Sequence, residues 1–280
     1  MNELANKTIL VTRPLPQAQA LLDAISQRSG RAIHLPTMEI VAFYQDSAQD
    51  SAQASVQKNA QQEAEKYPPI RRLILDIDHY EIAICISVTS AEQALAWLEQ
   101  HWPQMPTTIR WVAVGRSTAA VLQNAGLDVV YPEQLMDSGE LLKLDLLQQV
   151  ENKKIVLFKG EGGRDLIEKT LQQRGACLAI CELYQRRTLL ANAEALTRLL
   201  RENTVSAMTG HSGEMIESSV AMMGDDKAAK ATLFNVPLII PGERVAQKAK
   251  ELGFKTIVVA ENATTEVMIK TLCDWNRRLG

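Results

Sequence analysis

The chain has 280 residues, of which 46% are hydrophobic, 22% charged and 5% aromatic, a composition typical of a soluble globular protein. Because a domain usually holds roughly 100 to 150 residues, this length favours two domains over one. Thirty Lys and Arg residues against 33 Asp and Glu give a net charge of −3, which is too balanced for a protein that binds bulk nucleic acid or an anionic membrane surface. Sites for small anions stay open.

Apolar runs and cysteine spacing exclude further classes. The longest apolar runs, such as 82–86 and 236–240, are far shorter than the roughly 18 residues that a membrane-spanning helix needs. The first residues show no basic region followed by an apolar core, so a cytoplasmic location is expected. The four cysteines form no CxxC pair and the four histidines are scattered, so no metal site and reduced, partly buried thiols are expected.

Short runs rich in Val and Ile alternate with amphipathic segments, which is typical of parallel sheets flanked by helices. The first strand is expected at 9–12, followed by a helix at 17–28 whose apolar residues share one face. The other expected strands are 82–87, 111–114, 129–131, 155–158, 205–208, 238–240 and 257–260. The sequence therefore predicts an α/β fold.

A weak internal repeat indicates two related domains. A shift of 127 residues places 115–126 on 242–253, with two glycines and one alanine matched, and a shift of 122 places Ser90 on Ser212. Each copy begins as a strand, a turn and a helix, the pattern of a βαβ unit, and the first pair also shares a terminal glycine that suits a helix C-cap. The alternative is that unrelated βαβ units share glycines by chance.

Residues 46–66 interrupt the pattern with Gln, Ala, Ser and Glu and contain no Leu, Ile, Met or aromatic residue. Such a segment buries too little apolar surface to order itself. We expect a tolerated polar insertion at 46–69.

Small polar residues and glycines recur where strands pass into helices, while Walker A, GxGxxG, GxSxG and HExxH motifs are absent. The carboxyl ends of parallel strands and the adjoining helix N-termini favour anionic ligands, although the same residue types are ordinary caps and turn residues. The loop at 159–164 is the most specific, because its three glycines lie between two basic residues. The candidate binding residues are Thr12, Arg13, Ser90, Gly115, Thr118, Ser138, Gly139, Lys159, Gly160, Gly163, Arg164, Ser212 and Arg244.

Tyr184 lies in a strand-like segment at 177–187 beside a basic cluster. It is either a buried aromatic residue that fixes a linker or a proton donor in a cleft, and the residues alone leave both open.

Segments along nearly the whole chain, apart from the insertion, resemble the uroporphyrinogen-III synthase family in their order and spacing. They are 9–14 (ILVTRP), 17–21, 35–40, 114–119 (VGRSTA), 137–142, 160–164 (GEGGR), 182–186 (ELYQR) and 240–245. The resemblance implies two flavodoxin-like α/β domains with parallel sheets, a two-stranded antiparallel β-ladder between them, and an active site in the inter-domain cleft. It implies a discontinuous first domain at 1–36 and 188–280, ladder strands within 37–45 and 178–187, and a second domain at 70–177.

The resemblance also implies a reaction. Hydroxymethylbilane would be cyclised with inversion of ring D and loss of water, without a cofactor or metal, by a cytoplasmic monomer that makes at most transient contact with the preceding pathway enzyme. Tyr184 matches the family tyrosine proposed to assist hydroxyl loss, Thr118 the threonine of a central turn, and Ser212 a loop serine. Two positions depart from the family pattern: Gly210 stands where a polar residue is frequent, and Glu243–Val245 where Ser or Thr is frequent. The alternatives are a two-lobed binder of a carboxylate-rich ligand without catalysis, and a degenerate member that serves only protein contacts.

Overall fold

The computed structural model describes residues 2–43, 69–133 and 138–279, so the expected insertion at 46–69 lies outside the described residues except for its last position. The chain divides into two compact units. Unit 1 consists of Met1–Glu39 and Arg187–Gly280, and unit 2 of Ile40–Arg186. In the described ranges, no helix combines the length and apolar character that a membrane span requires.

Unit 1 contains a five-stranded sheet with the order β11-β10-β9-β1-β2, in which neighbouring strands run parallel. Its strands are β1 (Thr8–Val11), β2 (Arg31–His34), β9 (Ala207–Thr209), β10 (Leu238–Pro241) and β11 (Ile257–Ala260). Val and Ile dominate several of them, because β-branched side chains suit a pleated surface that is covered on both faces.

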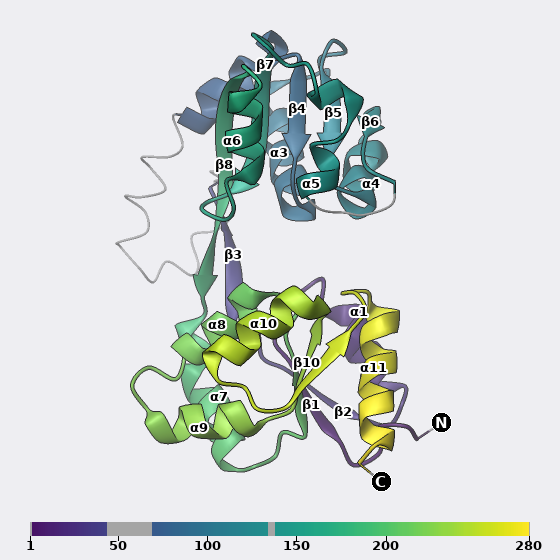
Figure 1. Cartoon of the computed structure of the whole chain (residues 1–280), viewed down its shortest axis with the longest axis vertical. Helices are drawn as coiled ribbons and strands as arrows, with labels where there is room; N and C mark the ends of the chain where they lie inside the picture. The colour runs from purple at the N-terminus through teal and green to yellow at the C-terminus, as the bar shows by residue number, and fades with distance from the viewer. Residues whose placement is uncertain (1, 44–68, 134–137, 280) are drawn as a thin grey trace. The chain divides into compact units, whose positions relative to one another are not determined.

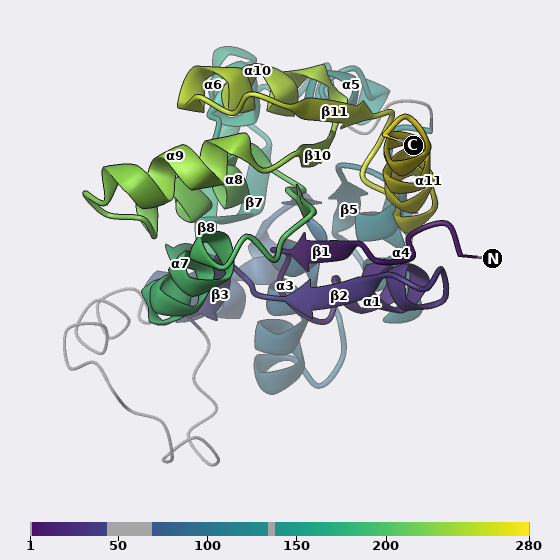
Figure 2. The same ribbon diagram turned by 90° about the horizontal axis from the view of Figure 1, so that it is seen from below.

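Helices cover both faces of this sheet (Figures 1 and 2). One face carries α1 (Gln19–Ser26) and α11 (Thr265–Arg277), and the other α7 (Ala193–Arg201), α8 (Gly213–Ala221), α9 (Lys227–Asn235) and α10 (Gly242–Leu252). A short 3-10 turn, η3 (Leu190–Asn192), precedes α7. Strand β1 shows the expected alternation: Ile9 and Val11 belong to the core under α1 and α11, and Leu10 to the core under the other helices.

Unit 2 contains a six-stranded sheet with the order β3-β8-β7-β4-β5-β6. Its strands are β3 (Met38–Ala42), β4 (Ile82–Cys85), β5 (Arg110–Ala113), β6 (Val129–Val130), β7 (Lys154–Gly160) and β8 (Cys177–Thr188). One face carries a helical segment at 69–75, α3 (Val88–His101) and α4 (Arg116–Asn124), and the other α5 (Ser138–Leu141) and α6 (Leu166–Gln173). Two 3-10 turns, η1 (Ile77–His79) and η2 (Asp145–Leu147), complete the unit.

Strand β8 is long because it has two partners. Up to Tyr184 it pairs in parallel with β7, while β3 is its neighbour on the other side. The Phe43 N–H donates to the Leu183 carbonyl and the Leu189 N–H to that of Thr37, both at 2.9 Å, and this numbering runs in the antiparallel sense. The predicted antiparallel pair is confirmed, but β8 also completes the parallel sheet, which the sequence did not indicate.

The two sheets share one topology. If unit 1 is counted from β9, through β10 and β11 to β1 and β2, its strand order is 3-2-1-4-5. Unit 2 without β3, counted from β4 to β8, has the same order, 3-2-1-4-5. Counted in chain order instead, unit 1 is 2-1-3-4-5, the flavodoxin-like arrangement. The prediction of two related α/β domains is confirmed, and the chain starts at a different point in each.

The eight strands expected from apolar runs are confirmed to within two residues at each end. Strand β2 was missed, because its only apolar residues are two positions between Arg31 and His34. It lies at the edge of the sheet, where strands are incompletely buried. The glycine stops are confirmed: Gly126 and Gly253 adopt left-handed φ values of 82° and 109° after α4 and α10, a conformation that glycine adopts without steric cost.

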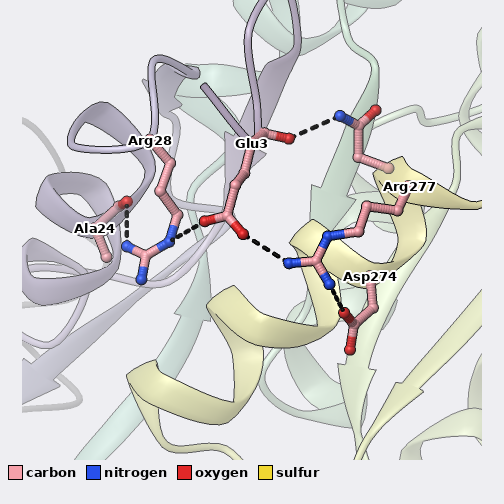
Figure 3. A network of polar contacts seen from close by, with 6 residues as sticks. Glu3, Ala24, Arg28, Asp274 and Arg277 are labelled. Atoms are coloured by element: carbon pink, nitrogen blue, oxygen red, sulfur yellow. Dashed lines mark hydrogen bonds and ion pairs between the residues drawn. The ribbon is translucent and has the colours of Figure 1, made fainter. Parts of the chain in front are cut away.

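Polar contacts join the two chain pieces of unit 1 (Figure 3). The Glu3 carboxylate accepts a hydrogen bond from Arg277 Nη2 at 2.7 Å and forms an ion pair with Arg28 Nε at 3.3 Å, while Arg277 Nη1 donates to Asp274 at 2.8 Å. The Asn276 amide adds a bond to the Glu3 carbonyl at 2.8 Å. The first strand region is thereby fixed to the last helix of the chain.

Candidate active site

Each sheet has one place where ligands are expected. In unit 2 the crossovers from β4 and β7 leave in opposite directions, and in unit 1 those from β9 and β1 do the same. In open α/β sheets, ligands bind at the carboxyl ends of the strands at such a topological switch point. Several predicted site residues lie directly after these four strands.

In unit 2 the switch point is occupied by Tyr184. The side chain is 1% exposed, and its hydroxyl lies 3.0 Å from Ser87 Oγ and 3.1 Å from Arg186 Nη2, which donates to it. The Arg186 guanidinium also lies over the tyrosine ring, 5.3 Å from its centroid. Tyr184 is therefore buried, as one sequence interpretation held, and its hydroxyl forms polar contacts at the switch point.

Ser87 is held in place by the start of α3. It is the N-cap, and its Oγ accepts a hydrogen bond from the Ser90 N–H at 2.9 Å, while Ser90 Oγ accepts from the Ser87 N–H at 3.0 Å. This capping box fixes the Ser87 side chain. Ser90 is fully buried and donates its hydroxyl to the Ser87 carbonyl at 2.8 Å. The predicted residue, Ser90, therefore has a structural partner, and it is the half-buried Ser87 that contacts the tyrosine. The sequence analysis missed Ser87, which it placed at the end of a strand.

The four candidate residues at the end of β7 and in the loop that follows it are of two kinds. Lys159 is 5% exposed and forms an ion pair with Glu168 of α6. Gly160 lies against the Tyr184 ring, opposite a register shift between β7 and β8. Gly163, with a φ of 84°, and Arg164 are exposed. Of these four candidates, Gly163 and Arg164 are the two that are accessible to an anion.

Unit 1 places a cation at its own switch point. Arg13 follows β1, is half-buried, and its guanidinium has no hydrogen-bond or ion-pair partner among the residues that the structure describes. Burial lowers its pKa from the ordinary value. Thr12 is 1% exposed and donates to the Thr209 carbonyl at 2.7 Å, which ties the ends of β1 and β9 together.

His211 lies beside this arginine and was not singled out in the sequence. Burial, and then the positive charge of Arg13, lower the pKa of His211 to about 4. Its Nδ1 is buried without a partner among the described residues. The imidazole is therefore neutral at pH 7, and Arg13 carries the positive charge of this edge.

The remaining predicted residues lie at or near the starts of helices. Ser212 is the N-cap of α8 and accepts from the Met215 N–H at 3.2 Å. Gly115 is the N-cap of α4 with extended backbone, Thr118 is 2% exposed on the same helix, and Arg244 is exposed near the start of α10. Ser138 and Gly139 begin the four-residue α5, directly after residues outside the described ranges.

One departure from the family pattern has a packing reason. A Cβ on Gly210 would lie 2.9 Å from Ile216 Cγ1, closer than real Cβ contacts allow. A side chain at residue 210 would therefore require Ile216 of α8 to shift, which disfavours a serine there.

Among the described residues, no group of three or more His, Cys, Asp or Glu side chains could hold a metal ion. All four cysteines are free thiols, three of them buried. Burial raises the pKa of Cys85, and burial followed by the charge of Glu182 raises that of Cys181 to about 12, so these two thiols are poor nucleophiles.

A family model described as uroporphyrinogen-III synthase HemD matches residues 19–270. The chain belongs to the uroporphyrinogen-III synthase family. The uroporphyrinogen-III synthase of Escherichia coli (strain K12) is 30% identical over 271 residues, covering 95% of this chain and 99% of that protein. That of Proteus mirabilis is 31% identical over 211 residues, covering 75% of this chain and 96% of that protein.

Solved structures show the same fold. A mutant uroporphyrinogen III synthase from the extremely thermophilic bacterium Thermus thermophilus matches with a TM-score of 0.63 and 17% identity, covering 98% of both chains. The uroporphyrinogen-III synthetase of Helicobacter pylori 26695 matches with a TM-score of 0.55 and 11% identity, covering 96% of this chain and 99% of that one. The resemblance noted in the sequence is confirmed: this is a family of hydro-lyases of tetrapyrrole biosynthesis, and it implies hydroxymethylbilane as the substrate.

Proposed function

We propose that the chain cyclises hydroxymethylbilane to uroporphyrinogen III, with inversion of ring D and loss of water, and that Tyr184 supplies the proton that assists the departure of the hydroxyl. Family membership supports the reaction. The observation that carries the role of Tyr184 is the position of its hydroxyl at the switch point of unit 2, between Ser87 Oγ and Arg186 Nη2.

The substrate is a linear tetrapyrrole with acetate and propionate arms, so binding it requires groups that hold carboxylates. Arg13 is suited to this role because it is a half-buried cation without a carboxylate partner in the described part of the chain. Guanidinium groups bind carboxylates through two parallel hydrogen bonds. The exposed Arg164 and Arg244, and the N-termini of α4, α8 and α10, supply further positive potential.

The proposed reaction needs few catalytic groups from the protein. Loss of the hydroxyl gives an azafulvene cation, which attack by the substituted carbon of ring D converts to a spiro intermediate, and opening and re-closure complete the inversion. Such a reactive substrate cyclises without help to the non-inverted isomer, so holding the productive conformation is the main task. The proton donor then accelerates the step in which the hydroxyl leaves.

The test is to supply fresh hydroxymethylbilane, oxidise the products and separate the porphyrin isomers. We expect the type III isomer, and we expect Tyr184→Phe to lower kcat more than it changes KM. Type I isomer alone, formed at the rate of the buffer control, would contradict the proposed reaction. A Tyr184→Phe variant with unchanged kcat would contradict the role of the tyrosine only.

We also propose that the protein works as a cytoplasmic monomer that makes at most transient contact with the enzyme that supplies its substrate. Free, largely buried thiols support a reducing compartment. Light scattering after gel filtration would test the monomer, because a stable dimer would elute at twice the mass of 31.0 kDa.

A further inference from the structure

The hydrogen bonds around Tyr184 have a direction that can be worked out. A tyrosine hydroxyl has one proton to donate, and a buried donor without an acceptor costs about 1 to 3 kcal/mol. Arg186 can only donate, so it occupies an acceptor position of the Tyr184 oxygen. The remaining partner within the described residues is Ser87 Oγ, at 3.0 Å. The Tyr184 proton therefore points to Ser87.

Counting donors and acceptors in the same way leaves the hydroxyl proton of Ser87 without an acceptor among the described residues. Its Oγ accepts from the Ser90 N–H at 2.9 Å and from the tyrosine, which uses both acceptor positions of a hydroxyl. Its own O–H has no acceptor among the residues that the structure describes. Ser87, two residues after β4, is half-buried, whereas Tyr184 is 1% exposed. The group that can reach a ligand is the serine, and the tyrosine lies behind it.

We infer that Ser87 is a catalytic residue that passes the proton to the substrate, that Tyr184 replenishes it from behind, and that Arg186 is a positioning residue for the tyrosine. This inference rests on the proposed function. Ser87 Oγ–H protonates the hydroxyl as the C–O bond of the substrate breaks, so that water leaves, and Tyr184 transfers its proton to Ser87 Oγ. The negative charge left on the tyrosine oxygen lies 3.1 Å from Arg186 Nη2. The proton that the ring system loses when re-closure is complete restores Tyr184 through Ser87, so no other reactant is consumed.

Two variants of Ser87 distinguish a role in proton transfer from a purely structural role as the N-cap of α3. Ser87→Asn keeps an oxygen that accepts from the Ser90 N–H, because Asn is a good N-cap, but removes the transferable proton. Ser87→Thr keeps both. We expect Ser87→Asn to lower the kcat for type III isomer by about 10²-fold, the lower end of general acid catalysis, with KM and melting temperature near those of the wild type. Ser87→Thr should restore most of the rate.

A double variant separates the relay from two independent effects. If Tyr184 acts through Ser87, the variant Tyr184→Phe/Ser87→Asn should be no slower than the slower single variant, because both changes break one chain of proton transfer. Losses that multiply in the double variant would overturn the relay. Full activity of Ser87→Asn, together with a slow Tyr184→Phe, would also overturn the relay but would leave the proposed function intact. Full activity of Tyr184→Phe would overturn both the relay and the proposed role of Tyr184 as proton donor, but not the proposed reaction.

Discussion

The backbone of Gly160 lies against the ring of Tyr184. A Cβ built on this glycine would lie 2.6 Å from Cε2 and 2.7 Å from Cζ of the tyrosine, distances that real Cβ atoms do not show. The sequence suggested that Gly160 leaves room for a bound anion, whereas the structure shows that it leaves room for the side chain of Tyr184. A glycine at this position therefore makes room for Tyr184, the proposed proton donor.

We predict that Gly160→Ala displaces the Tyr184 ring and breaks its hydrogen bond to Ser87. The expected result, for the fraction of the protein that folds, is a loss of kcat comparable to that of Tyr184→Phe, because the added methyl group and the buried ring cannot occupy the same space. Steady-state kinetics with hydroxymethylbilane and a thermal melt are the measurements.

The matched control is Gly175→Ala, which adds a methyl group at a crowded position of the same unit. There the new Cβ would lie 3.1 Å from Glu151 Cγ, at a φ of 81°. This variant should lose stability and keep its activity when folded. Equal kcat for both alanine variants would show that Gly160 has no special relation to the tyrosine.

The ion pair between Lys159 and Glu168 gives a second prediction. Their side chains are 7% and 16% exposed, and removing one partner of a buried pair leaves an uncompensated charge, at a cost of about 3 to 5 kcal/mol. Glu168→Gln should lower the free energy of unfolding in urea by an amount near the lower end of that range. The double variant Lys159→Met/Glu168→Leu should regain much of the loss, because apolar residues can replace a buried pair. A Glu168→Gln protein as stable as the wild type would show that Lys159 reaches solvent, and would return it to the set of anion-binding candidates.

The sequence predicted most of the strands because a buried parallel strand needs a continuous apolar run, and that property is local. Strand β2 was not predicted, since an edge strand can carry polar residues such as Arg31 and His34. The pairing of β8 with two strands was not predicted either, because pairing depends on residues that are distant in the chain. The sequence alone suggested two related domains from a repeat, and the shared strand order explains why that repeat exists.

The site was less predictable than the fold. A strand-to-helix turn indicates where a ligand binds, but it does not say which hydroxyl is free. Ser90 and Ser87 are three residues apart, and only their hydrogen-bond partners show that the Ser90 hydroxyl is satisfied inside the capping box while the Ser87 hydroxyl also contacts Tyr184. The partners of Lys159 and Thr12 are likewise set by tertiary contacts.

The contacts of Glu3 predict a salt-dependent stability of unit 1. The hydrogen bond from Arg277, and the positive charges of Arg277 and Arg28, lower the pKa of Glu3 despite some opposing desolvation, so the favourable interaction is complete above the ordinary carboxyl pKa and is lost as the pH falls through the lowered value. Arg277→Gln should lower the melting temperature at low salt by a few degrees. The difference should shrink at about 1 M NaCl, where the screening length is about 3 Å. Lys169→Gln, which breaks a pair with Asp165 within one region of unit 2, is the control and should shift the melting temperature less, because it joins no distant chain segments.

His211 predicts how stability depends on pH. Burial and the charge of Arg13 lower its pKa to about 4 from 6.5, so between these values the unfolded chain binds a proton that the folded chain does not. Stability must therefore fall as the pH drops from about 6.5 to about 4, by an amount on the order of 3 kcal/mol for this residue. In His211→Asn that contribution disappears, so the free energy of unfolding of the variant should rise relative to the wild type as the pH is lowered. His79→Asn, which changes an exposed histidine of unit 2, controls for the loss of a histidine as such and should follow the wild-type curve. If the free energy of unfolding depended on pH in the same way in His211→Asn and the wild type, Arg13 and the imidazole would not share a buried site. The proposal that Arg13 binds a carboxylate in unit 1 would then be weakened.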